Sequence, residues 1–373
     1  HTLHYCTSCS YSYEEYPEIV SSITFKSKNN GTCTVVSLTD NTIENLVIPQ
    51  TNPDGDTVVA ISDKAFMRNS TLKSVTLPST VKEIGQMAFC GCTSLKEING
   101  TQYATTIKGS AFAESTLITS LDLSGATTLD SYVCRAMTNL SSIKLSNKLK
   151  KLPQGIFASC TSLLNVDLPS SITVIGNSAF QSTNIENIVL PDSVEEIEMY
   201  AFRYCEKLKS VGLSKNLEKI NPLVFEGCSN LNDIVLPDGL KTLGRLAFSG
   251  CESLTKINLP GTITSIGDSC FNGCKELTSI TLPDTFEDLG DFAFMNCRRL
   301  KKIYLGTSIT NIGSGAFENC TSLTSVFLPK SLQSIKTETY DKNPFTGCSG
   351  TLDLYSDAPK SNTIWERYFG VVS

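Results

Sequence analysis

The sequence predicts a repeat solenoid of about 13 units, in which one long parallel β-sheet runs along the stack. Three observations predict it. A small residue followed by Phe recurs every 22 or 23 residues, an apolar I-x-L triplet recurs with the same period, and Pro follows that triplet in eight units. The recurring anchor residues are Phe66, Phe89, Phe112, Cys134, Phe157, Phe180, Phe202, Phe225, Phe248, Phe271, Phe294 and Phe317.

Each unit contains a short strand followed by a return segment. Ile257 and Leu259 lie two residues apart, so both side chains point to one side of a strand. Pro260 has no amide hydrogen for a ladder and ends that strand. A second apolar pair then carries the chain back as an irregular or short helical segment. Gly267 permits an unusual backbone angle or a close approach, and Phe271 fills the interior.

A single coil cannot bury its apolar face, so the coils must stack into a right-handed, curved solenoid with strands about 4.8 Å apart. Terminal coils need caps, because they would otherwise expose core and sheet edge. We therefore expect three parts: a cap over residues 1–42, the solenoid over 43–348 and a second cap over 349–373. The caps should contain a hairpin at Ile23–Leu38, a last strand at Leu352 and Leu354, and a lid made of Trp365, Tyr368 and Phe369.

The repeated motif L-x-x-I-x-L-P…I-G-x-x-A-F-x-x-C extends from about Ile43 to Cys348. It resembles the BspA-like leucine-rich repeat of surface proteins from anaerobic bacteria and some parasitic protists. Some units depart from the motif, since Cys134 replaces Phe and no Pro follows Leu123. The resemblance implies an extracellular or bacterial cell-surface protein that binds host or microbial surface proteins.

Composition argues against several functional classes. The 31 Lys and Arg residues against 37 Asp and Glu give a net charge of −6, which provides no electrostatic attraction to nucleic acid or to an anionic membrane. The only histidines are His1 and His4, and no catalytic or phosphate-binding motif occurs, so we expect no enzyme activity and no cofactor. Neither a signal peptide nor a membrane-spanning apolar run is present, which favours a mature or trimmed soluble chain.

Cysteines follow the repeat. One position of the unit holds nine of the 15: Cys92, Cys160, Cys205, Cys228, Cys251, Cys274, Cys297, Cys320 and Cys348. A ladder of disulfides or metal sites is one interpretation, but parallel side chains on stacked coils are poorly aimed for disulfides, so we expect buried free thiols. Cys6-x-x-Cys9 near His4 is a weak zinc candidate, and a disulfide is the favoured interpretation there, with free thiols as the other alternative.

The outer face of the sheet is the candidate binding surface, because residues on either side of each central Ile point away from the core. Asp122, Lys144 and Asp167 alternate in charge across adjacent strands, which simple cross-strand pairing would also explain. Tyr304 and Phe327 place aromatic rings beside Lys302, unless they pack against an insertion near the C-terminus. The full candidate set is Asp122, Lys144, Asp167, Val235, Lys256, Lys302, Tyr304 and Phe327.

These patterns favour binding over chemistry. The resemblance suggests a protein partner, either a host extracellular protein or a microbial surface protein. The alternative is a structural stalk that presents another domain and has no ligand of its own. An enzyme is the third interpretation, and no activated nucleophile or acid–base pair supports it.

Overall fold

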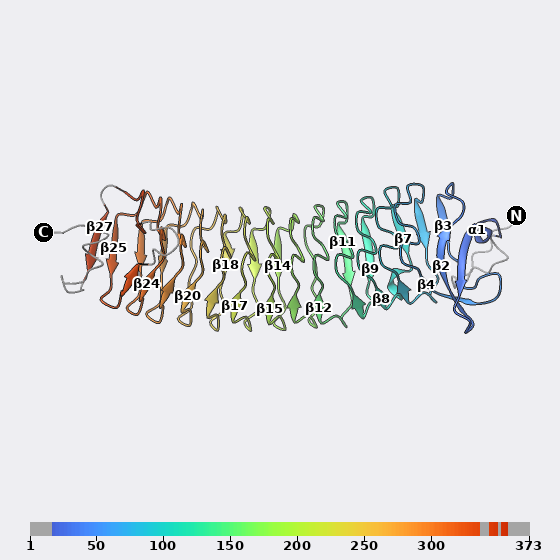
Figure 1. Ribbon diagram of the computed structural model, residues 1–373, viewed down its shortest axis with the longest axis horizontal. Helices are drawn as coiled ribbons and strands as arrows, with labels where there is room; N and C mark the ends of the chain where they lie inside the picture. The colour runs from blue at the N-terminus through green and yellow to red at the C-terminus, as the bar shows by residue number, and fades with distance from the viewer. Residues whose placement is uncertain (1–16, 336–342, 350–351, 357–373) are drawn as a thin grey trace. The chain divides into compact units, whose positions relative to one another are not determined.

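A computed structural model describes residues 17–335, 343–349 and 352–356 (Figure 1). The chain divides into two compact units, His1–Ile172 and Thr173–Ser373. Within each unit the coils stack with their strands side by side, which confirms the predicted parallel β-solenoid. Helix in the described residues is confined to α1 (Pro17–Ser21) and a 3₁₀ turn, η2 (Thr101–Tyr103).

The I-x-L triplets form the predicted parallel ladder in the N-terminal unit. Alternation along each triplet turns the central residue inward, so that Val75 of β5 is buried while its two neighbours are partly exposed. The strands of this ladder are β3 (Asn45–Val47), β5 (Ser74–Thr76) and β7 (Glu97–Asn99), followed by the pair β9 (Ser120–Leu123) and β11 (Ser142–Leu145).

The C-terminal unit repeats this ladder with the same register. Each strand is displaced by one unit of sequence from its neighbour, as in the pairing of Ile280 with Ile303. The strands are β14 (Asn187–Val189), β16 (Ser210–Gly212) and β18 (Asp233–Ile234), then β21 (Ser279–Thr281), β23 (Lys302–Tyr304), β25 (Ser325–Leu328) and β27 (Asp353–Ser356).

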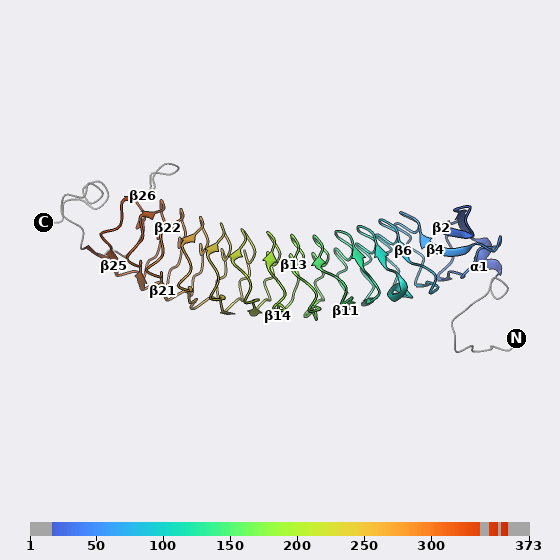
Figure 2. The ribbon, with the colours of Figure 1, turned by 90° about the horizontal axis from the view of Figure 1, so that it is seen from below.

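The return segments form a second parallel ladder, which the sequence interpretation left irregular or helical. Figure 2 shows the two ladders on opposite sides of the coils. The second ladder arises because the apolar residue after each return turn is held one coil from its equivalent, close enough for backbone pairing. Its strands are β4 (Thr57–Ile61), β6 (Glu83–Ile84), β8 (Thr106–Ile107), β10 (Thr128–Leu129) and β12 (Lys151–Leu152) in one unit, and β13 (Val174–Ile175), β15 (Glu196–Ile197), β17 (Lys219–Ile220), β19 (Thr242–Leu243), β20 (Ser265–Ile266), β22 (Asp288–Leu289), β24 (Asn311–Ile312) and β26 (Ser334–Ile335) in the other.

The expected N-terminal hairpin is present. Strands β1 (Ile23–Ser27) and β2 (Thr32–Leu38) pair antiparallel, and β2 continues in parallel with β4. The hairpin therefore covers the edge of the return ladder. At the other end β27 pairs with β25, which confirms the strand expected around Leu354. The expected lid of Trp365, Tyr368 and Phe369 lies outside the described residues, and the three-part division of the chain stays a prediction.

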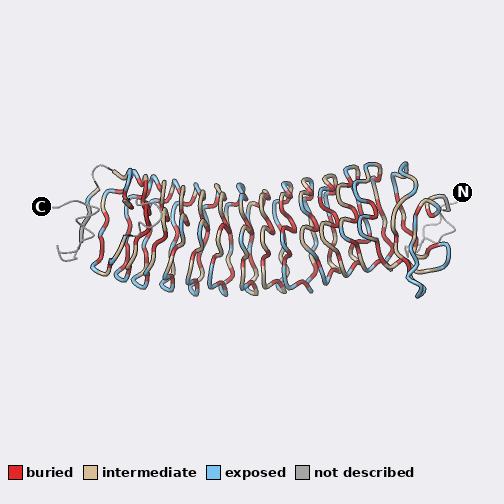
Figure 3. The backbone as a smooth tube through the Cα atoms, viewed as in Figure 1, coloured by how far each residue is buried: buried red, intermediate tan, exposed pale blue. Residues whose placement is uncertain are grey.

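The core of each unit is a column of Phe rings. Phe248 and Phe271 are stacked with ring centroids 5.4 Å apart, and Phe271 and Phe294 with centroids 5.3 Å apart. The backbone N–H of Phe248 donates to the carbonyl of Cys270 in the next coil, at 2.8 Å. In Figure 3 buried segments run through every coil, and exposed segments lie at the turns and along the outer side of the coils. Each anchor is thus held by its ring and by its backbone at once.

The glycine after the return strand serves a close approach between coils. A Cβ on Gly267 would lie 2.6 Å from the backbone nitrogen of Arg245, and one on Gly290 would lie 2.5 Å from that of Asp268. Neither glycine has a positive φ. Of the two possibilities left open by the sequence, steric clearance is therefore the one that applies.

Exposed ion pairs join neighbouring coils within each unit. Examples are Lys73 with Glu44 at 2.7 Å, and Lys241 with Glu218 at 2.9 Å. Because these side chains are about half exposed, each pair contributes on the order of 0–1 kcal/mol. The stack is therefore held mainly by its core and its backbone hydrogen bonds.

Replacement of Gly267 by Ala tests the close approach. We expect a loss of about 2 kcal/mol in the free energy of unfolding, measured by urea denaturation, because the new methyl group meets backbone that cannot move aside. Gly261→Ala is the matched control, since no heavy atom lies within 4 Å of a Cβ there. Equal effects of the two substitutions would contradict the assignment.

Candidate functional site

The outer face of the I-x-L ladder has the predicted alternation. In β23, Ile303 is 8% exposed and points into the core, while Lys302 and Tyr304 on either side of it are exposed. The strand itself is fixed by backbone pairing on both sides, to β21 and to β25. Side chains on this face therefore project from a rigid framework.

The charged trio is only partly brought together. Lys144 lies directly opposite Asp122 across β11 and β9, with Nζ 3.7 Å from Oδ2. Partial burial acts to raise the pKa of Asp122, but hydrogen bonds from Ser124 and the charge of Lys144 outweigh it and lower that pKa. Asp167 is exposed, and no ion pair joins it to Lys144 in the described structure. The contacts of Asp122 and Lys144 are those of a cross-strand pair.

Tyr304 and Phe327 lie on neighbouring strands, and their side chains are 43% and 45% exposed. The register that pairs Ile303 with Val326 places these two aromatic residues next to each other. The Tyr304 hydroxyl donates to Oδ1 of Asp284 at 3.0 Å, and this hydrogen bond raises the pKa of Tyr304. Lys302 is exposed on the same strand. Most of the insertion that was the alternative packing partner lies outside the described residues.

An apolar group on the same face was only half recognised from the sequence. Val189 and Val235 are 75% and 76% exposed, on either side of Gly212. A Cβ on Gly212 would lie 3.2 Å from Cγ1 of Val189, so this valine leans over the glycine. Val235 was a predicted candidate and Val189 was not. The Val-Gly-Val order in the outward row was the available signal. Lys256 is exposed in the next coil.

Eight of the nine repeated cysteines are buried free thiols, as expected, and Cys348 is a half-buried free thiol. All 13 cysteines in the described part of the chain are free, and no group of three or more metal-binding side chains occurs there. The thiol of Cys251 donates to the carbonyl of Phe225 at 3.3 Å, and that of Cys297 to the carbonyl of Phe271 at 3.2 Å. Each thiol therefore satisfies an anchor carbonyl of the preceding coil. Cys6, Cys9 and His4 lie outside the described residues.

Burial suppresses ionisation of these thiols. It raises the pKa of Cys92, Cys160 and Cys205 to about 12, and that of Cys348 to about 11. The thiolate is the nucleophile and metal ligand, so at neutral pH these groups are unreactive. The column is structural.

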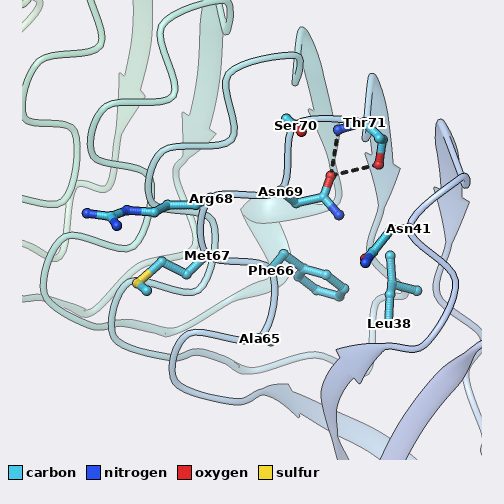
Figure 4. A pocket seen from close by; sticks show the side chains of 9 residues that line it. All are labelled: Leu38, Asn41, Ala65, Phe66, Met67, Arg68, Asn69, Ser70 and Thr71. Atoms are coloured by element: carbon cyan, nitrogen blue, oxygen red, sulfur yellow. Dashed lines mark hydrogen bonds between the residues drawn. The ribbon is translucent and has the colours of Figure 1, made fainter.

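A shallow pocket in the N-terminal unit lies between the end of β2 and the turn that contains Phe66 (Figure 4). Leu38 and Phe66 line it together with Arg68 and Asn69. The amide oxygen of Asn69 accepts hydrogen bonds from the backbone and hydroxyl of Thr71, at 2.9 and 3.1 Å. The lining contains no carboxylate, histidine or cysteine, so it offers no acid–base pair.

A family profile described as "BspA type Leucine rich repeat region", with six copies, matches residues 59–183, 127–255 and 241–350. The chain belongs to this family. BspA-type repeats are non-catalytic and typical of bacterial surface proteins, and they generally serve as protein-interaction modules. A comparison with curated proteins gives no match. None of the described helices has the length and hydropathy needed to cross a lipid bilayer.

Solved structures agree with the family. A leucine-rich cell surface protein from Faecalibacterium prausnitzii is 25% identical, with a TM-score of 0.58, and the match covers 94% of this chain and 97% of that one. The pneumococcal vaccine antigen PcpA is 20% identical, with a TM-score of 0.54, and the match covers 91% of this chain and 98% of that one. The second likeness shows the fold alone.

Burial of the BspA-type thiol column predicts slow alkylation. With iodoacetamide at pH 8, we expect the buried column to stay unmodified in the native protein, while Cys90, which is only half-buried, reacts first. Peptide mapping by mass spectrometry resolves each site, and the urea-unfolded protein is the control. Rapid native labelling of Cys251 or Cys274 would contradict the burial.

Proposed function

We propose that this chain is a non-enzymatic protein-binding module, exposed on a bacterial surface or secreted, that engages host or microbial surface proteins through the outer face of its I-x-L ladder. The observation that carries the proposal is the pair of exposed aromatic rings, Tyr304 and Phe327, held next to each other on paired strands beside Lys302. Aromatic and cationic side chains of this kind are the usual anchors of protein interfaces.

The electrostatics of the face support a protein partner. Charged side chains near the ladder largely neutralise one another between coils, as Lys209 and Glu186 do at 2.8 Å. The face therefore has no extended cationic field for nucleic acid, and recognition depends on local apolar and polar contacts. The apolar pair Val189 and Val235 extends the contact area within the same unit.

The double variant Tyr304→Ala/Phe327→Ala tests the proposal. We expect at least about a tenfold loss of affinity for a partner, found by biolayer interferometry against purified extracellular-matrix and bacterial surface proteins. The melting temperature should change little, because both rings are nearly half exposed. Tyr103→Ala, whose side chain is 43% exposed in the other unit, is the matched control.

The possible outcomes separate the alternatives. A melting temperature lowered by several degrees would show that the two rings belong to a cap of the core. Failure to bind any protein of the panel would favour the stalk.

A further inference from the structure

Six neighbouring coils of the C-terminal unit present an uninterrupted strip of outward side chains. The coils run from β14 to β23, and backbone hydrogen bonds such as Thr278 N–H to the Thr255 carbonyl, at 3.2 Å, continue the stack where no strand is assigned. The strip has two columns: Asn187, Ser210, Asp233, Lys256, Ser279 and Lys302 in the first, and Val189, Gly212, Val235, Asn258, Thr281 and Tyr304 in the second.

The order of these residues is self-complementary. A rotation by 180° about an axis parallel to the strands reverses the order of the coils but keeps each column opposite itself. If the axis passes midway between the coils of Asp233 and Lys256, the rotation brings Asp233 of one copy over Lys256 of the other, and the reverse. This is the requirement for an isologous contact, in which each pair of residues that meets does so twice, once on either side of the axis.

The same axis also pairs the residues of the second column. The axis places Val189, which is 75% exposed, against Tyr304 of the other copy, so that two exposed apolar groups cover each other. It also places Thr281 over Gly212, which has no side chain of its own and over which Val189 leans. At the remaining positions Val235 meets Asn258, and Lys302 of the first column meets Asn187.

The central charges are available for this contact. Asp233 and Lys256 are exposed, and neither takes part in an ion pair within the described residues, although they lie on adjacent coils. By contrast, Lys209 and Glu186 at the border of the strip already neutralise each other. Lys302 of the strip also has no ion pair among the described residues and faces Asn187, so Asp233 and Lys256 are the two unpaired charges of opposite sign that the symmetry brings together.

We propose that a second copy of this chain docks on the strip through this two-fold contact. Six strands about 4.8 Å apart give a contact on the order of 30 Å long and only one strand wide. It is smaller than the roughly 800 Å² per partner of a standard interface, so the dimer is weak, with a dissociation constant in the range of tens of micromolar. This dimer contact lies on the outer face of the I-x-L ladder, the same face that the proposed function uses. It forms without a foreign protein, and a foreign protein bound to this face would compete with the second copy.

Charge-reversal variants test the proposal, with self-association measured by sedimentation velocity. The full chain is used, and dithiothreitol is present to prevent cross-linking through thiols. We expect the wild-type sedimentation coefficient to rise between about 2 and 200 µM chain. Asp233→Lys and Lys256→Asp should each weaken association about tenfold, because each places like charges opposite one another. The double variant Asp233→Lys/Lys256→Asp should restore it.

The control is Asp238→Lys, which makes the same charge change in the same coil at an exposed position beyond the strand. Its association should match that of wild type, and the melting temperatures of all variants should agree. A monomer at every concentration, or a double variant as weak as the single ones, would overturn the proposal. Binding of a foreign partner, which tests the proposed function, is measured at about 0.1 µM chain, where the dimer is absent. The result of that experiment is therefore independent of the result for self-association.

Discussion

The structure depends on one constraint: each coil must place its anchor side chain and its backbone, and in most coils a thiol as well, against the neighbouring coils at the same time. The ring of Phe271 stacks on its neighbours, while its carbonyl accepts the thiol of Cys297 and its N–H donates to Ala293. No coil has a core of its own. Residues can be added only outside these contacts: Phe345 follows Phe317 by 28 residues, yet the two rings stack at 5.4 Å and the Cys348 thiol donates to the Phe317 carbonyl at 3.1 Å.

This constraint also leaves one face available for recognition. Side chains at inward positions pack against those of neighbouring coils, and the turns form hydrogen bonds between coils. The outward positions of the I-x-L ladder lie outside the core, and only some of them bond between coils, as Ser210 does with Asn187 at 2.7 Å. Val189, Tyr304 and Phe327 remain exposed there, whereas most large apolar side chains of the described residues are buried. Exposed apolar side chains on a rigid face are what the proposed binding function requires, and a spacer has no need of them.

Thiols have a structural role that differs from their usual chemistry. A cysteine column at one repeat position suggests disulfides or metal when it is read as a spacing alone. In the coils, the Sγ of Cys251 instead faces the Phe225 carbonyl within an apolar interior. Burial that raises the pKa of such a thiol also keeps it from reacting. The same contact therefore provides cohesion and chemical inertness.

The sequence by itself determined the repeat, the strand in each unit, the inward Phe and Cys positions and the N-terminal hairpin, because these follow from local alternation and a fixed period. It also identified the outward rows. Only the tertiary structure decided that Gly267 serves clearance, that the return segments pair as strands, that Lys144 contacts Asp122 and that Val189 leans over Gly212. Those outcomes depend on how residues of neighbouring coils, about 23 positions apart in the sequence, lie relative to one another in space. The sequence pattern does not specify the distances between atoms of neighbouring coils.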